Sequence, residues 1–223
     1  MNAKRQASSS RSITAQPKTT SRGTDQRGGS VRIIGGEWRS RKLNFPSAEG
    51  LRPTADRVRE TLFNWLQRSV PAARVLDLFA GSGALGFEAA SRGASSVVLV
   101  EKNAAAAASL RVNKQALAAS SVEVIAADAL QWLAANSQRT FDLVFVDPPF
   151  AEAMQLRVCQ ALADSGCLAP GALVYVETSA PLAAESYPAG WRVTKTKRAG
   201  AVHSTLLQIA PLPTAPLPVA PTA

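Results

Sequence analysis

An alternation of short apolar runs with Ala-rich helical stretches, from residue 74 to residue 209, constrains the fold of this chain more than any other feature. Short apolar runs are typical of parallel strands that are buried on both faces. The runs expected to be strands span residues 74–79, 96–101, 122–125, 141–146 and 172–177, and two further β-like runs span 191–197 and 201–209. The helices expected between the first five runs span residues 84–92, 104–118, 129–135 and 152–164. This order predicts an α/β fold, with a doubly wound, mostly parallel seven-stranded sheet that ends in an antiparallel edge.

Two segments precede this pattern. Residues 1–30 are rich in Ser, Thr, Arg and Gly without a hydrophobic period, so we expect a disordered basic tail. Residues 31–46 have the pattern of a β-hairpin with a tight turn at Gly35-Gly36. A helix is expected to follow from Thr54, its N-cap, to about Gln67. The expected units are therefore the tail, a small N-terminal hairpin and helix at 31–70, the sheet domain at 71–210 and a Pro- and Ala-rich tail at 211–223.

The charge of the chain is concentrated at its N-terminal end. The formal net charge is +9, of which residues 1–30 carry +5 and residues 31–70 carry +4, while residues 71–223 hold eleven basic and eleven acidic side chains. A neutral body with a basic arm indicates a polyanionic partner, most often nucleic acid. A solubilising tail is the alternative for residues 1–30.

Composition also limits the location of the protein. The hydrophobic fraction of 46% excludes bulk disorder, and no apolar run approaches the roughly 18 residues of a membrane helix. The first twenty residues contain no apolar core of a secretory signal, and two cysteines are too few for a disulfide framework or a Cys-based zinc site. We expect a cytoplasmic monomer that contacts no membrane and holds no metal.

A Gly-rich stretch follows the first expected strand and opens a helix, from Asp77 through Gly81 and Gly83 to Gly86. Glycines let a backbone turn tightly and approach a ligand, but dinucleotide enzymes share this spacing. Asp77 argues against a phosphate ligand, because a carboxylate repels a phosphate and attracts a cation. The ammonium of the amino-acid part of S-adenosylmethionine is such a cation.

Two more carboxylates follow the next two expected strands. Glu101 lies about twenty residues beyond the Gly-rich stretch, where a carboxylate can accept both ribose hydroxyls of a cofactor. Asp128 can accept from an adenine amino group or cap the helix that follows it, and the two roles are compatible.

The motif Asp147-Pro148-Pro149-Phe150 follows the apolar run 141–146. Consecutive prolines end the strand ladder and leave the Pro148 carbonyl able to accept a hydrogen bond. The Asp147 carboxylate and this carbonyl can each accept one N–H of an exocyclic amine, which aims the nitrogen lone pair at an electrophilic methyl. Phe150 can stack on the base.

Taken together, these motifs resemble the class I S-adenosylmethionine-dependent amino-methyltransferases, whose fold is a Rossmann-like doubly wound sheet. The stretches GGEWRSRKL, LRPTADRVRETLFNWL and FAGSGALGFEAASRGA resemble one subfamily, the bacterial enzymes that methylate guanine N2 in 16S ribosomal RNA. The likeness spans roughly residues 31–209. It implies a guanine of small-subunit rRNA as substrate, on an assembled particle or its precursor.

The resemblance also implies site residues. Arg52, Pro53 and Thr54 would border the methionine end of the cofactor, and Phe79 belongs to the matching Gly-rich motif. The basic residues beside the site are expected to contact RNA, and they are Arg32, Arg39, Arg41, Lys42, Arg52, Arg57 and Arg59.

Three alternatives stay open at this stage. An adenine-N6 methyltransferase would use the same amine geometry. Asp77 and the Asp-Pro-Pro-Phe motif argue against a nicotinamide-dependent oxidoreductase. The intact set of strand-end acids argues against a non-catalytic RNA-binding factor with a relic site.

Overall fold

The computed structural model describes residues 28–46, 56–148 and 154–210. Residues 1–27 of the expected N-terminal tail and the whole expected C-terminal tail lie outside these ranges, as do Arg52, Thr54, Pro149 and Phe150. The end of the expected disordered tail is wrong, because Gly29 and Ser30 belong to a β-strand.

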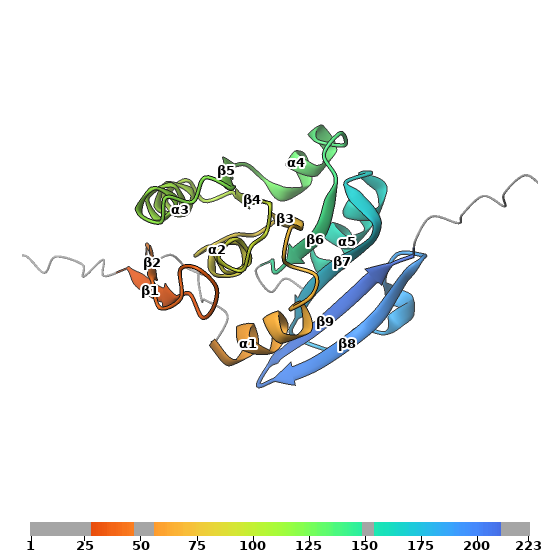
Figure 1. The fold of residues 1–223 in the computed structure, drawn as a ribbon. Helices are drawn as coiled ribbons and strands as arrows, with labels where there is room; N and C mark the ends of the chain where they lie inside the picture. Colours follow the sequence, from red (N-terminus) through yellow and green to blue (C-terminus); the bar gives the residue numbers. More distant parts are fainter. Residues whose placement is uncertain (1–27, 47–55, 149–153, 211–223) are drawn as a thin grey trace, which may run out of the picture.

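A seven-stranded sheet forms the centre of the structure (Figure 1). Its strands lie in the order β5-β4-β3-β6-β7-β9-β8, where β5 to β7 are parallel and β9 runs antiparallel to both its neighbours. The strands are β3 (Arg74–Asp77), β4 (Ser96–Glu101), β5 (Val122–Ala126), β6 (Phe141–Val146), β7 (Leu168–Thr178), β8 (Trp191–Ala199) and β9 (Val202–Ile209). The doubly wound sheet with an antiparallel edge is thus confirmed, and β7 begins four residues before the expected Ala172.

Helices cover both faces of this sheet. On one face lie α1 (Asp56–Trp65), α2 (Ala84–Ser91) and α3 (Ala104–Ala116), and on the other lie α4 (Ala129–Ala135) and α5 (Met154–Asp164). A short 3-10 turn, η1 (Ala184–Ser186), precedes β8. Successive side chains of a strand point to opposite faces of the sheet, so the apolar residues of the strands contribute to two cores, one on each face. None of the helices in the described ranges is long and apolar enough to cross a membrane.

The N-terminal hairpin pairs β1 (Gly29–Arg32) with β2 (Lys42–Phe45). The expected tight turn at Gly35-Gly36 is wrong, because the two strands are joined by the nine residues 33–41. Gly36 instead lies against the end of α2. A Cβ at Gly36 would lie 1.8 Å from the Ser91 carbonyl oxygen, and its φ of 78° also favours glycine.

Polar groups of α2 hold this connection in place. The Glu88 carboxylate accepts the Ile34 N–H at 2.6 Å and the Gly35 N–H at 2.8 Å, and the Ser91 hydroxyl accepts the Trp38 N–H at 2.9 Å. Apolar residues of the hairpin, among them Ile33 with no exposed surface, belong to the same core as α1 and α2. The hairpin unit therefore shares its packing with the sheet domain.

Candidate functional site

The carboxyl ends of the central strands bring the expected acids to one edge of the sheet. Asp77 ends β3, Glu101 ends β4 and Asp147 directly follows β6. Since β3 lies between β4 and β6, the three residues occupy neighbouring strand ends. In open α/β sheets this edge is where ligands bind.

The Gly-rich turn between β3 and α2 is tied to the neighbouring strand. The Gly81 N–H donates to Glu101 Oε2 at 2.8 Å. Gly83, the residue before α2, has a φ of 79°, and a Cβ there would lie 2.6 Å from the Phe87 ring. A glycine suits this position, because the backbone is left-handed and a side chain would collide with Phe87 and Leu110.

Asp77 is buried and only partly satisfied. The Gly86 N–H donates to its Oδ2 at 3.1 Å, while Oδ1 has no hydrogen-bond partner among the described residues. The pKa of this carboxyl is raised to about 7, mainly by burial and to a smaller extent by the charge of Glu101, against the backbone amides of Gly86 and Phe79, which lower it. A buried carboxylate with one unpartnered oxygen fits a cationic group, as the ammonium of S-adenosylmethionine is.

Glu101 and Asp128 also have structural partners. Glu101 Oε1 accepts the Asn103 N–H at 2.6 Å, and each oxygen of a carboxylate can accept a second donor. Asp128 is the N-cap of α4, where its Oδ1 accepts the Leu130 N–H at 3.1 Å. Its Oδ2 lies 3.2 Å from Lys102 Nζ, and this bond is the largest influence that lowers the pKa of Asp128. The expected helix cap is present, while contacts of both acids with a cofactor stay predictions.

Asp147 is half-buried and Pro148 is buried at the end of β6. The register pairs Phe145 with Tyr175 of β7, so the carboxyl end of β6 lies beside that of β7. The pKa of Tyr175 is raised well above its usual value by burial, by the charge of Glu177 and also by that of Asp147. The amine-accepting role of Asp147 and Pro148 stays a prediction, as does base stacking by Phe150.

Most of the basic residues expected to contact RNA are exposed. Those with exposed side chains in the described ranges are Arg32, Arg39, Arg41, Lys42 and Arg57. Arg32 pairs with Asp56 at 2.7 Å, and Arg41 donates to the Ala116 carbonyl at 2.8 Å.

Arg59 does not fit its expected role, because its side chain has no exposed surface. Its Nη2 donates to the Arg32 carbonyl at 2.9 Å and to Asp56 Oδ1 at 2.6 Å, and its Nη1 lies 3.6 Å from Glu88 Oε2. The hydrogen bonds to Arg32 and Asp56 and the ion pair with the buried Glu88 hold Arg59 inside the protein, and Arg59 as an RNA contact is corrected to a structural role.

Sequence reasoning missed two features near this edge. Tyr175 donates to Glu177 at 2.7 Å and contacts the Ser204 hydroxyl at 2.9 Å, and all three side chains are buried. Strand β8 carries four basic side chains and no acidic one. This local basic cluster was not noticed because the net charge of residues 71–223 as a whole is zero. Within the described ranges, no group of three or more His, Cys, Asp or Glu could hold a metal ion.

Comparisons with known proteins agree with this geometry. The family described as "Conserved hypothetical protein 95" matches residues 31–208. Ribosomal RNA small subunit methyltransferase D of Escherichia coli is 45% identical over 180 residues, which cover 81% of this chain and 90% of the relative. A solved putative methyltransferase from the same organism superposes with a TM-score of 0.74 at 44% identity, over 82% of this chain and 99% of that one. A Thermus thermophilus 16S rRNA N2-guanine methyltransferase with bound AdoMet and guanosine shares the fold, with a TM-score of 0.62 at 24% identity over 82% of this chain and 50% of that one.

Proposed function

This chain belongs to the Conserved hypothetical protein 95 family, and on that premise we propose that it transfers a methyl group from S-adenosylmethionine to the exocyclic N2 amine of a guanine in small-subunit (16S) ribosomal RNA. One observation carries the proposal: the expected cofactor site and the expected amine site lie at the ends of two neighbouring strands, in a chain that is similar to a small-subunit rRNA methyltransferase. Asp77 ends β3 and the Gly-rich turn follows it, while Asp147 and Pro148 directly follow the neighbouring strand β6.

The residues that would hold the cofactor surround the end of β3. The unpartnered Oδ1 of Asp77 would bind the ammonium, and the bare backbone at Gly81 and Gly83 would let the cofactor approach closely. Glu101 would accept the ribose hydroxyls through its remaining lone pairs. Asp128 would accept from the adenine amine, and Phe79 and Thr54 would border the cofactor. S-adenosylmethionine supplies an already electrophilic methyl on its sulfonium, so the protein's task is orientation and exclusion of water.

Orientation of the guanine amine falls to the end of β6. The Asp147 carboxylate and the Pro148 carbonyl would each accept one amine N–H, which turns the nitrogen lone pair toward the methyl. Pro148 is buried, so these acceptors are held on a rigid element. The target guanine must leave its stack to reach them, which favours an unpaired nucleotide.

The partner would be the small ribosomal subunit or its precursor in the cytoplasm, contacted by a monomer. Arg39, Arg41 and Lys42 lie exposed on the hairpin, whose inner side is fixed to α2, so they would set the register of the RNA. Reversing all three to Glu should cripple methylation even at low salt. Deletion of residues 1–30 should leave saturated turnover nearly intact and only make the salt dependence of RNA binding shallower. If the triple reversal binds and methylates like the parent, the hairpin plays no part in RNA docking.

One experiment tests the reaction itself. The protein is incubated with labelled methyl donor and small subunits that lack the modification, and the labelled nucleoside is then identified. We expect N2-methylguanosine at one position, and loss of the label with Asp147→Ala. N6-methyladenosine would replace the proposal with the adenine reaction, and absence of label would refute both.

A further inference from the structure

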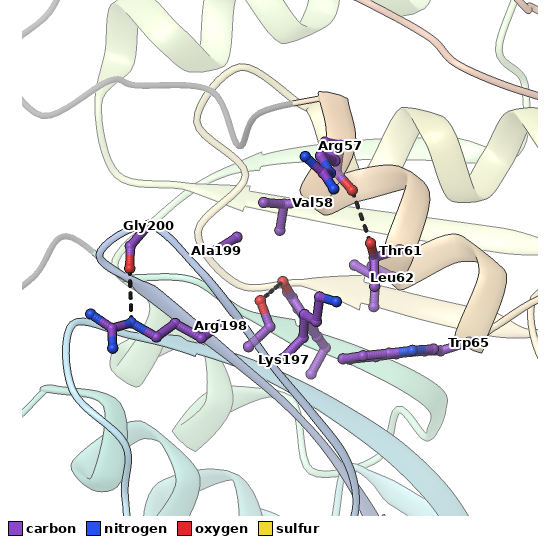
Figure 2. Close-up of a pocket in the computed structure, with 11 residues that line it drawn as sticks. Arg57, Val58, Thr61, Leu62, Trp65, Lys197, Arg198, Ala199 and Gly200 are labelled. Carbon is purple, nitrogen blue, oxygen red and sulfur yellow. Dashed lines mark hydrogen bonds between the residues drawn. The ribbon is translucent and has the colours of Figure 1, made fainter.

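A groove separates helix α1 from the β8–β9 hairpin (Figure 2). Its upper part is a cavity of about 510 Å³ between Arg57 and Thr61 on the helix and Lys197 and Gly200 on the hairpin. Its lower part, of about 420 Å³, continues past Lys195 toward Asp142. Trp65 of α1 lines both parts. We call this feature the α1–β8 groove.

Two lysines of β8 face this groove. Lys195 lies opposite Leu206 and Lys197 opposite Ser204 in the antiparallel pair of β8 and β9. Side chains directly opposite each other share one face of a sheet. Leu206 packs in the core beneath α1, so both lysines project on the α1 side. Arg57 lies across the groove from Lys197, as Figure 2 shows.

The groove carries basic side chains that form no ion pairs with neighbouring acids in the described ranges. Within the described part of the chain, no ion pair involves Arg57, Lys195 or Lys197. Asp142, the acid that lines the lower cavity, is already held by Arg74 at 2.8 Å. A groove with exposed cations whose charges are not neutralised by neighbouring acids attracts an anion.

The floor of the groove leads toward the proposed reaction site. Tyr175 lines the upper cavity and pairs in register with Phe145, two residues before Asp147. Its hydroxyl contacts Ser204, which also lines the cavity. A strand of nucleic acid in this groove would therefore pass beside the end of β6.

We propose that the α1–β8 groove binds the single-stranded RNA segment next to the target guanine, with phosphates on Arg57, Lys195 and Lys197 and a base stacked on Trp65. A row of cations beside an aromatic ring is the usual chemistry of single-stranded nucleic-acid grooves. This inference rests on the proposed function and adds a second RNA-binding surface, on the opposite side of α1 from the basic N-terminal hairpin.

A charge-matched comparison tests the groove. One variant carries Lys195→Glu and Lys197→Glu, and its control carries Arg111→Glu and Arg157→Glu, exposed cations of α3 and α5 away from the groove. Binding to a single-stranded RNA oligomer and to unmodified small subunits is titrated with salt, alongside methyl incorporation and calorimetry with S-adenosylhomocysteine. A third variant, Lys195→Arg with Lys197→Arg, keeps the charge.

We expect the groove reversal to lower the efficiency of methylation at least tenfold and to make the salt slope of oligomer binding shallower by roughly 1.4, about 0.7 for each phosphate that the protein no longer neutralises. Cofactor binding should not change, and the control and the Arg variant should match the parent. Equal effects of reversal and control would overturn the inference, because only total charge would then matter. If the groove reversal weakens binding to the small subunit but not to the RNA oligomer, the inference is also overturned, and the groove would instead bind a ribosomal protein. If the parent itself methylates no rRNA, the proposed function fails instead.

Discussion

Replacing Asp77 with Asn should remove a pH dependence from the stability of the cofactor-free protein. Burial raises the pKa of this carboxyl from 3.8 to about 7. The folded state thus keeps a proton that the unfolded chain has released. The resulting stabilisation is complete below the unfolded pKa of 3.8 and is lost as the pH rises through about 7.

The two pKa values set the size of the effect. Between about pH 5.5 and about pH 8.5, the contribution of Asp77 to the free energy of unfolding should fall by about 2 kcal/mol. Asn carries no charge at either pH, so the variant should lack this fall. Its amide would bury an N–H at the position of Oδ1, an oxygen that has no hydrogen-bond partner among the described residues. That cost, about 1–3 kcal/mol, is the same at both pH values and cancels in the comparison.

Urea unfolding of the parent, Asp77→Asn and the control Asp164→Asn at the two pH values measures the difference. Asp164 is an exposed acid at the end of α5, so its variant should follow the parent. Addition of S-adenosylhomocysteine, which keeps the cofactor's ammonium, should flatten the pH dependence of the parent by pairing the Asp77 carboxylate. If the free energies of the parent and Asp77→Asn change equally between the two pH values, the raised pKa of Asp77 is refuted.

Three further variants examine other parts of the site. Asp147→Ala should lower single-turnover methyl transfer by orders of magnitude with little change in cofactor affinity, and near-normal turnover of the folded variant would exclude amine positioning by this residue. Glu101→Ala should weaken cofactor binding in calorimetry by about 2–4 kcal/mol, because it removes the proposed acceptors of the ribose hydroxyls and the hydrogen bond to Gly81; unchanged affinity would remove Glu101 from the cofactor site. Arg59→Met should lower the free energy of unfolding by about 1–3 kcal/mol, because it removes the Arg59–Glu88 pair and the hydrogen bonds to Arg32 and Asp56, while Arg92 stays beside Glu88 at 2.7 Å. A decrease below about 1 kcal/mol would contradict a stabilising role for that pair.

The sheet and its edge could be predicted because strand and helix periodicities are local properties of the sequence. Once the runs at 74–79, 96–101 and 141–146 are taken as parallel strands, their carboxyl ends must meet. The common edge of Asp77, Glu101 and Asp147 follows from this rule alone. The hydrogen-bond partners of each acid do not, since they depend on backbone positions in the turns.

The errors share a different cause, which is a partner far away in the chain. The pair Gly35-Gly36 carries a tight-turn signal, yet Gly35 binds Glu88 and Gly36 lies against Ser91, both on α2 and more than fifty residues later. Arg59 falls outside the apolar face of its helix, but its hydrogen bonds to Arg32 and Asp56 and its ion pair with the same Glu88 keep it buried. No local period reports such a contact. The cations of β8 were visible in the sequence and were obscured only by counting charge over too long a segment.

The attachment of the hairpin to Glu88 limits how this enzyme can be altered. Grafting the sheet domain onto a foreign RNA-binding module would strip the buried carboxylate of the Ile34 and Gly35 amides and of Arg59. A replacement hairpin would need free amides at both positions, so proline is barred from either one. The exposed cations Arg39, Arg41 and Lys42 of the hairpin carry no such demand, apart from the bond of Arg41 to the Ala116 carbonyl. A change of RNA target among proteins with this fold should therefore occur by substitution of Arg39, Arg41 and Lys42, while the residues of the hairpin that contact α2 are kept. Exchange of the whole hairpin should be rarer.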